Sequence, residues 1–286
     1  MSEWQEIQAR YSSFDGIRIH YRLLIPREST CNTVMLVHGF GEHAGRYGNL
    51  YKHFVPKGYE VYAPDLRGHG LSEGLKGHVD KFSNYIEDLK ILHKKIEGDK
   101  PAKCELTCGN ILIGHSMGGL IALRYALDYP DGLCAVIVSG PLLKLAMPVP
   151  GWKKSMGKFM SRLFPKFRMP NELDPNLLSH DPQVAPMYEK DPLVNHMVSS
   201  RWFTEATAAM ENVLARASSL RLPLLMLHGG SDKLCSVDGT KQFFDRCRSP
   251  DKTLKIYDGM YHEIFNEINH KQVMADIEAW LKERGL

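Results

Sequence analysis

Short, mostly apolar runs alternate with segments of helical periodicity along much of the chain. The runs predict buried strands and lie at 59–63, 111–113, 135–139, 222–227 and 254–257. The helical segments follow them at 81–96, 117–129, 237–247 and 271–284. Strands that alternate with helices form a sheet covered on both faces. The pattern therefore predicts an α/β fold with a mostly parallel central sheet flanked by helices.

Two regions depart from this alternation. Residues 17–26 and 33–37 are extended runs around a turn with Pro, Ser and Asn, which predicts an early hairpin. Residues 141–201 are rich in Pro, Met, Phe and Lys, and proline at that density interrupts long regular elements. We expect an irregular helical lid there, inserted into a catalytic body formed by residues 1–140 and 202–286.

Composition narrows the class of protein. The 286 residues suit one α/β domain with an insertion, and 43% hydrophobic with 24% charged residues is typical of a globular protein. A net charge of +3 is too small to predict a nucleic-acid partner. The chain has no signal peptide pattern and no apolar run near the length of a membrane span. Six cysteines without framework spacing are expected to be reduced, in a cytoplasmic protein.

The strongest local signal is the sequence GHSMG at 114–118. It follows an apolar strand and opens a helix, which is the context that the G-x-S-x-G nucleophile motif requires. The sharp turn would expose the hydroxyl of Ser116, and the flanking glycines would allow it. A chance match of five residues is the alternative. The strand before the motif and the helix after it favour a nucleophile.

Two later strand ends offer partners for Ser116. Asp232 follows the run at 222–227, and His262 follows the run at 254–257. The order Ser, Asp, His is that of the α/β-hydrolases, and each residue follows the carboxyl end of a strand, where such sheets place their sites. Asp232 alone could be a helix cap, with Asp238 and Asp258 as weaker rivals, and His262 alone could be a surface histidine. Together they predict a catalytic triad.

An oxyanion hole needs two backbone N–H groups aimed at the developing charge. Met117 follows the nucleophile, and Phe40 lies in the glycine loop HGFG at 38–41, so these two are the predicted donors. The loop lacks the glycine spacing and lysine of phosphate-binding loops. The sequence HEIFN at 262–266 lacks the second histidine of a zinc motif. We therefore expect neither a metal nor a cofactor.

Several longer motifs resemble the monoacylglycerol lipases. They are HGFGEHAGRY at 38–47, DLRGHGLSEG at 65–74, GHSMGG at 114–119, DPL at 191–193, GSDKLC at 230–235 and DKTLKIY at 251–257. The likeness extends from about residue 11 to 280 and implies an α/β-hydrolase that releases a fatty acid and glycerol from monoacylglycerols. Phe40 is bulkier than the alanine usual there in the mammalian members, which should change the shape of the pocket.

The same resemblance suggests which residues contact the substrate. Glu42, Arg46, His115 and Tyr188 would lie near the glycerol end, where a triol calls for polar partners. For Glu42 with Arg46, the alternative is a structural ion pair that braces the oxyanion loop.

The lid also carries an amphipathic pattern. In 152–164, apolar residues recur at helical spacing among Lys153, Lys154, Lys158 and Arg162. A basic helix with an aromatic face suits the surface of an anionic membrane, so we expect peripheral membrane association. The alternative is that this face packs on the body. Two other functions stay open: a lysophospholipase or general carboxylesterase with the same triad, and a non-catalytic binding module on a hydrolase scaffold.

Overall fold

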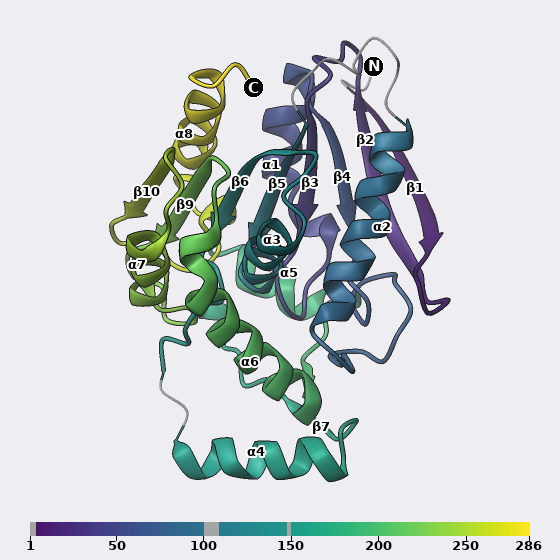
Figure 1. Cartoon of the computed structure of the whole chain (residues 1–286), viewed down its shortest axis with the longest axis vertical. Helices are drawn as coiled ribbons and strands as arrows, with labels where there is room; N and C mark the ends of the chain where they lie inside the picture. Colours follow the sequence, from purple (N-terminus) through teal and green to yellow (C-terminus); the bar gives the residue numbers. More distant parts are fainter. Residues whose placement is uncertain (1–3, 100–108, 148–149) are drawn as a thin grey trace.

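The computed structural model describes residues 4–99, 109–147 and 150–286. Its centre is an eight-stranded sheet in the order β1-β2-β4-β3-β5-β6-β9-β10 (Figure 1). The strands are β1 (Trp4–Ser12), β2 (Arg18–Pro26), β3 (Thr33–Val37), β4 (Glu60–Pro64), β5 (Asn110–His115), β6 (Leu133–Ser139), β9 (Leu224–Gly229) and β10 (Lys252–Tyr257). All pairs from β4 through β10 in this order are parallel, which confirms the predicted mostly parallel sheet.

The beginning of the chain differs from the prediction. Strand β2 pairs antiparallel with β1 on one side and with β4 on the other. Strand β3 lies between β4 and β5, parallel to both. The predicted hairpin of 17–26 with 33–37 is therefore wrong. The true partner, β1, is an edge strand with mostly exposed side chains, so its sequence lacks the apolar run that marks the buried strands.

Helices cover both faces of the sheet. They are α1 (Gly48–Phe54), α2 (Ser83–Asp99), α3 (Met117–Asp128), α4 (Gly151–Leu163), α5 (Val184–Lys190), α6 (Ser200–Arg216), α7 (Val237–Arg246) and α8 (His270–Lys282). Helices α2, α3, α6 and α7 contribute to the core on one face, and α1 with α8 to the core on the other. Side chains of β3 alternate between the two cores, as in any strand buried on both sides.

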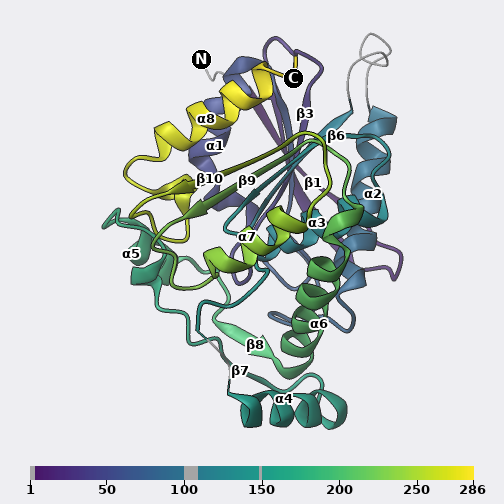
Figure 2. The ribbon, with the colours of Figure 1, turned by 60° about the vertical axis from the view of Figure 1, so that its left-hand side comes forward.

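The segment between β6 and β9 holds α4, α5 and α6 together with a small sheet of β7 (Arg168–Pro170) and β8 (Met197–Ser199). Helix α4 lies far from the main sheet and next to α6 in both views (Figure 2). The segment also contacts the body, because the Asn195 N–H donates to the Gly41 carbonyl at 2.7 Å. His43 Nε2 lies 2.8 Å from Asp191 Oδ2 in a second contact. Both contacts lie on the loop after β3.

One expectation about the cysteines is wrong. Cys31 is disulfide-bonded, although nothing in its spacing marked it. Cys104 and Cys108 lie outside the described residues. Cys134, Cys235 and Cys247 are free thiols, as expected. None of the helices in the described ranges is long and apolar enough to cross a membrane.

Candidate active site

Ser116 occupies a strained turn between β5 and α3. Its backbone has φ 54° and ψ −118°, a conformation that costs about 1–3 kcal/mol for a residue other than glycine. Two glycines make the turn possible. A β-carbon added to Gly114 would lie 2.3 Å from the Gly118 carbonyl oxygen, and one added to Gly118 would lie 2.1 Å from that of Val37. No larger residue fits at either position, so the sequence GHSMG builds this turn and places Ser116 at its tip.

Asp232 and His262 meet at the same edge of the sheet. They follow the carboxyl ends of β9 and β10, which are adjacent parallel strands. His262 Nδ1 donates to Asp232 Oδ2 at 2.7 Å, and both side chains are buried. Burial alone would lower the pKa of His262, but the Asp232 carboxylate and its hydrogen bond raise it above its ordinary value. The pair therefore stabilises an imidazolium, as a general base next to a nucleophile requires.

The Asp232 carboxylate is fully hydrogen-bonded. Its Oδ1 accepts from the N–H groups of Leu234, at 2.8 Å, and Cys235, at 3.0 Å. Burial would raise the pKa of Asp232, but the charge of His262 and the hydrogen bonds from His228 and His262 hold it well below its ordinary range. The acid stays ionised throughout the neutral range.

His228 also belongs to the candidate site, although the sequence analysis did not predict a role for it. It is fully buried, and its Nε2 lies 3.1 Å from both Asp232 Oδ2 and the Cys235 carbonyl oxygen. Both neighbours only accept hydrogen bonds, so Nε2 carries a proton. Nδ1 lies 2.7 Å from the Thr240 hydroxyl of α7. The one signal in the sequence is the position of His228, four residues before Asp232 at the end of β9.

The two segments that carry the predicted oxyanion donors both lie next to Ser116. Met117 is the first residue of α3, so its N–H has no partner within the helix. A β-carbon added to Gly39 would lie 3.2 Å from the Ser116 β-carbon, so the loop carrying Phe40 lies against Ser116. The Phe40 ring packs on Trp202 of α6, with ring centroids 4.1 Å apart.

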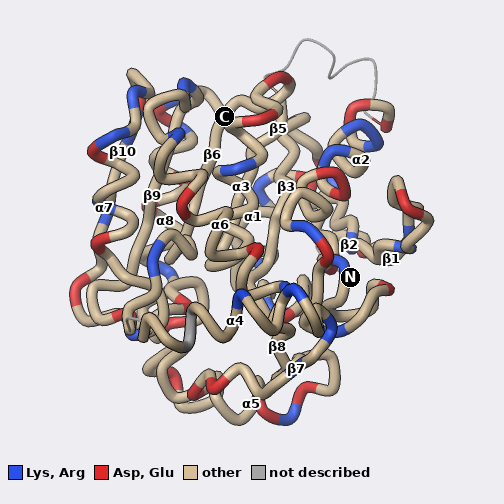
Figure 3. Tube along the Cα trace, turned by 60° about the horizontal axis from the view of Figure 1, so that its bottom comes forward, with Lys and Arg blue, Asp and Glu red and all other residues tan. Residues whose placement is uncertain are grey.

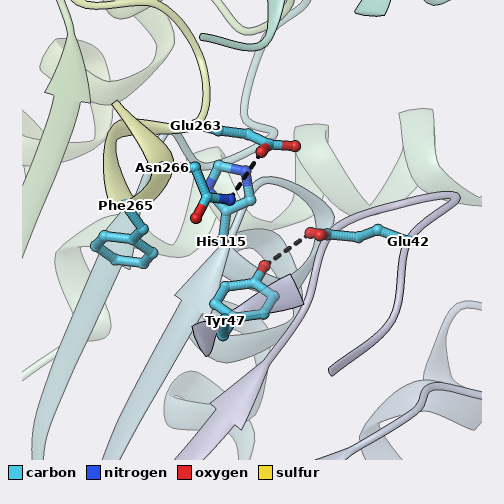
Figure 4. A pocket seen from close by; sticks show the side chains of 6 residues that line it. All are labelled: Glu42, Tyr47, His115, Glu263, Phe265 and Asn266. Atoms are coloured by element: carbon cyan, nitrogen blue, oxygen red, sulfur yellow. Dashed lines mark hydrogen bonds between the residues drawn. The ribbon is translucent and has the colours of Figure 1, made fainter. Parts of the chain in front are cut away.

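Glu42 and Arg46 belong to a buried ionic network. Glu42 Oε1 accepts from the Gly39 N–H at 2.6 Å and from the Tyr47 hydroxyl at 2.7 Å. Arg46 contacts Glu42 Oε2 at 3.0 Å and both carboxylate oxygens of Glu263, at 2.6 and 2.9 Å. These contacts are those of a buried ion pair that braces the loop after β3. Figure 4 shows the small cavity at this network, lined by Glu42, Tyr47, His115, Glu263, Phe265 and Asn266.

His115 and Tyr188 lie near this network. The His115 ring is centred 4.7 Å from that of His262, and burial, aided by His262, lowers the pKa of His115 to about 4. Tyr188 of α5 is buried with its ring 4.8 Å from the Arg46 guanidinium. Among the described residues, neither its hydroxyl nor Asn171 Nδ2 has a hydrogen-bond partner. A β-carbon added to Gly41 would lie 3.2 Å from the former and 3.7 Å from the latter, so two unused polar atoms lie beside this loop.

The chain matches a known family of enzymes. The family described as "Serine aminopeptidase, S33" matches residues 28–269. The chain belongs to this family. This match, together with the lipase relatives and solved structures described next, confirms the predicted α/β-hydrolase fold and the prediction of a carboxylic ester hydrolase.

Relatives of this chain include lipases. A monoacylglycerol lipase of Mycolicibacterium smegmatis is 36% identical over 272 residues, which cover 95% of each chain. An uncharacterized abhydrolase domain-containing protein of Dictyostelium discoideum is also 36% identical over 94% of this chain, but this chain spans only 28% of that protein. A soluble variant of the monoglyceride lipase of Saccharomyces cerevisiae, solved with a substrate analogue, has a TM-score of 0.86 at 25% identity, covering 99% of this chain and 96% of the other. The resemblance to monoacylglycerol lipases is confirmed.

Proposed function

We propose that this enzyme hydrolyses monoacylglycerols to a fatty acid and glycerol through an acyl-enzyme formed on Ser116. The observation that carries the proposal is the Asp232–His262 hydrogen bond of 2.7 Å, which lies at the sheet edge where the strained Ser116 turn also lies. Membership of a serine hydrolase family and relatives named as monoacylglycerol lipases support the substrate class.

The mechanism follows from the protonation of His262. Because Nδ1 donates to Asp232, Nε2 is free to accept the proton of Ser116 as its oxygen attacks the ester carbonyl. The N–H groups of Phe40 and Met117 then stabilise the oxyanion. Glycerol leaves with the proton from His262, and a water molecule hydrolyses the acyl-enzyme by the same route. Asp232 fixes the imidazole and stabilises its cation.

We place the glycerol end of the substrate beside the ionic network. The unpartnered atoms Tyr188 Oη and Asn171 Nδ2 lie next to Gly41. In the same loop, Gly39 lies against Ser116. A glycerol hydroxyl would satisfy both, and buried polar groups favour a ligand that does so. His115 would border the same end. Glu42 and Arg46 would shape this end of the pocket without binding the substrate directly, since Arg46 already forms ion pairs with Glu42 and Glu263.

Residues 141–201 would serve as the lid, and α4 as its membrane contact. The apolar side chains of α4 point to solvent, with Trp152 64% and Phe159 61% exposed, whereas its packing on α6 uses Gly157 and Ser161. This exposure supports membrane contact over packing on the body. The sequence of α4 has Lys and Arg but no Asp or Glu (Figure 3), which suits anionic headgroups. The side chains of Lys153 and Lys154 lie outside the described residues.

A substrate panel on the purified enzyme tests the proposal. We expect the largest kcat/KM for a monoacylglycerol, and smaller values for lysophosphatidylcholine and for a short p-nitrophenyl ester. Faster turnover of lysophosphatidylcholine would replace the proposal with a lysophospholipase. Faster turnover of the short ester would indicate a general carboxylesterase, and no turnover at all would favour a binding module.

A further inference from the structure

Cys235 is a buried free thiol in the active site for which the mechanism has no use. It follows Asp232 by three residues, and Ser116 is one of the groups that affect the pKa of its thiol. Its backbone N–H bonds to Asp232 Oδ1, which fixes the position of the residue. The thiol therefore lies among the groups that carry the reaction.

This thiol completes a set of metal-ligating atoms. One ligand atom from each of Asp232, Cys235 and His262 lies within 4.8 Å of the other two, and all three residues are buried. Zinc binds nitrogen and oxygen at about 2.0–2.2 Å and sulfur at about 2.3 Å, so ligands around a tetrahedral ion lie roughly 3.3–3.6 Å apart. Side-chain movements of about 1 Å would bring the three atoms to these distances.

We propose that Asp232, Cys235 and His262 form an inhibitory binding site for a thiophilic divalent cation such as Zn²⁺ or Cd²⁺. A thiolate, an imidazole and a carboxylate are the ligands that such ions select, whereas Mg²⁺ and Ca²⁺ prefer oxygen alone. The thiolate and the carboxylate together neutralise the charge of the dication. The ion inhibits because it occupies the base and the acid of the triad and lies beside Ser116.

Binding is coupled to release of a proton. A thiol carries its proton near neutral pH, whereas the thiolate is the form that binds the ion. When the ion binds, the sulfur–hydrogen bond breaks, a sulfur–metal bond forms and the proton passes to solvent. Affinity for the ion should therefore rise with pH, and a chelator should restore activity.

Titration of the whole chain with Cd²⁺ tests the site without a substrate. The ultraviolet charge-transfer absorption of a cadmium–thiolate bond should appear with one equivalent of Cd²⁺ and disappear in Cys235→Ser. Cys247→Ser is the matched control, because Cys247 is also a buried free thiol but lies at the end of α7. It should keep the absorption.

Inhibition of short-ester hydrolysis gives the second measurement, with each variant compared with its own metal-free rate. Zn²⁺ should inhibit the parent and Cys247→Ser alike, EDTA should reverse this, and Cys235→Ser should need at least about tenfold more Zn²⁺. The proposed metal site would be overturned if Zn²⁺ inhibited Cys235→Ser as strongly as the parent. It would also be overturned if the cadmium–thiolate absorption persisted in Cys235→Ser. An enzyme that binds Cd²⁺ at Cys235 but hydrolyses no ester would overturn the proposed function and leave the metal site standing.

Discussion

At the scale of single residues, the Asp232 carboxylate is held by hydrogen bonds to both of its oxygens. One oxygen accepts two backbone N–H groups and the other faces two imidazoles. The rival carboxylates have other surroundings: Asp238 lies in the first turn of α7, and Asp258 is exposed after β10. The sequence favours Asp232 over these two rivals without excluding them, because it does not reveal which carboxylate points at the histidine.

Asp232→Asn should lower kcat by about 10⁴-fold, because an amide would hold the imidazole of His262 in the wrong tautomer. The same change at Asp238 or Asp258 should leave kcat within a few-fold. Turnover of a short ester, with thermal unfolding as the control for folding, distinguishes them. A larger loss at either control position would mean that the acid is wrongly assigned.

The pH dependence of kcat/KM reports on His262 and on the second histidine, His228. Because the pKa of His262 is raised above its ordinary value, activity should rise with pH to a half-maximal point above about 6.5, where the base loses its proton. His228→Leu removes a hydrogen bond to the Asp232 carboxylate. The carboxylate would then attract the His262 imidazolium more strongly and raise the pKa of His262 further. The half-maximal point should then move to higher pH.

His228→Gln is the conservative control, since its amide can still donate to Asp232. It should keep the parent's pH profile, while His228→Leu shifts it with little change in KM. If both variants lose activity equally with an unshifted profile, His228 acts only through packing.

At the scale of elements, the buried strands and the helices that follow them could be predicted because each carries an apolar signal of its own. The buried strands were found within a few residues of β4, β5, β6, β9 and β10. Strand β1 could not be found this way, since its side chains face solvent. Without β1, the only neighbouring run that could pair with 17–26 is the run at 33–37. The hairpin prediction is wrong for this reason.

The turn at Ser116 depends on Gly118. Gly118→Ala would bring a methyl group to 2.1 Å from the Val37 carbonyl oxygen, so β3 and α3 must separate. We expect loss of activity and destabilisation by about 1–3 kcal/mol, measured by denaturant unfolding. Gly48→Ala is the control, because nothing lies within 4 Å of the added carbon, and it should keep both activity and stability. Parent-like behaviour of Gly118→Ala would contradict the described turn.

We expect helix α4 to contribute to membrane binding but not to the rate of ester hydrolysis itself. Replacing Trp152 and Phe159 by Ser should weaken binding to anionic vesicles and slow hydrolysis of vesicle-borne monoacylglycerol. Binding of the parent should fall with salt, each basic residue near the surface contributing about 1 kcal/mol. A water-soluble short ester should be hydrolysed at the parent's rate. Equal losses on both substrates would mean that these side chains belong to the pocket or the core.

At the scale of the whole molecule, the sequence allowed a prediction of the site but not of the contacts around it. Ser116, Asp232 and His262 could be proposed together because parallel strands present their carboxyl ends at one edge. The hydrogen bond from Asn195 to Gly41 and the ionic partner Glu263 of Arg46 could not be predicted. Each joins segments whose separation in sequence carries no periodic signal.

The central claim is that Ser116 is the nucleophile of a monoacylglycerol hydrolase. Release of fatty acid from a monoacylglycerol by the parent and by Ser116→Ala tests it most directly. The substitution removes one oxygen atom at a partly exposed turn, so thermal unfolding should be unchanged. The account predicts that the parent releases fatty acid and that the variant loses at least about 10⁴-fold in kcat. A folded Ser116→Ala variant that hydrolyses monoacylglycerol near the parent's rate would contradict it.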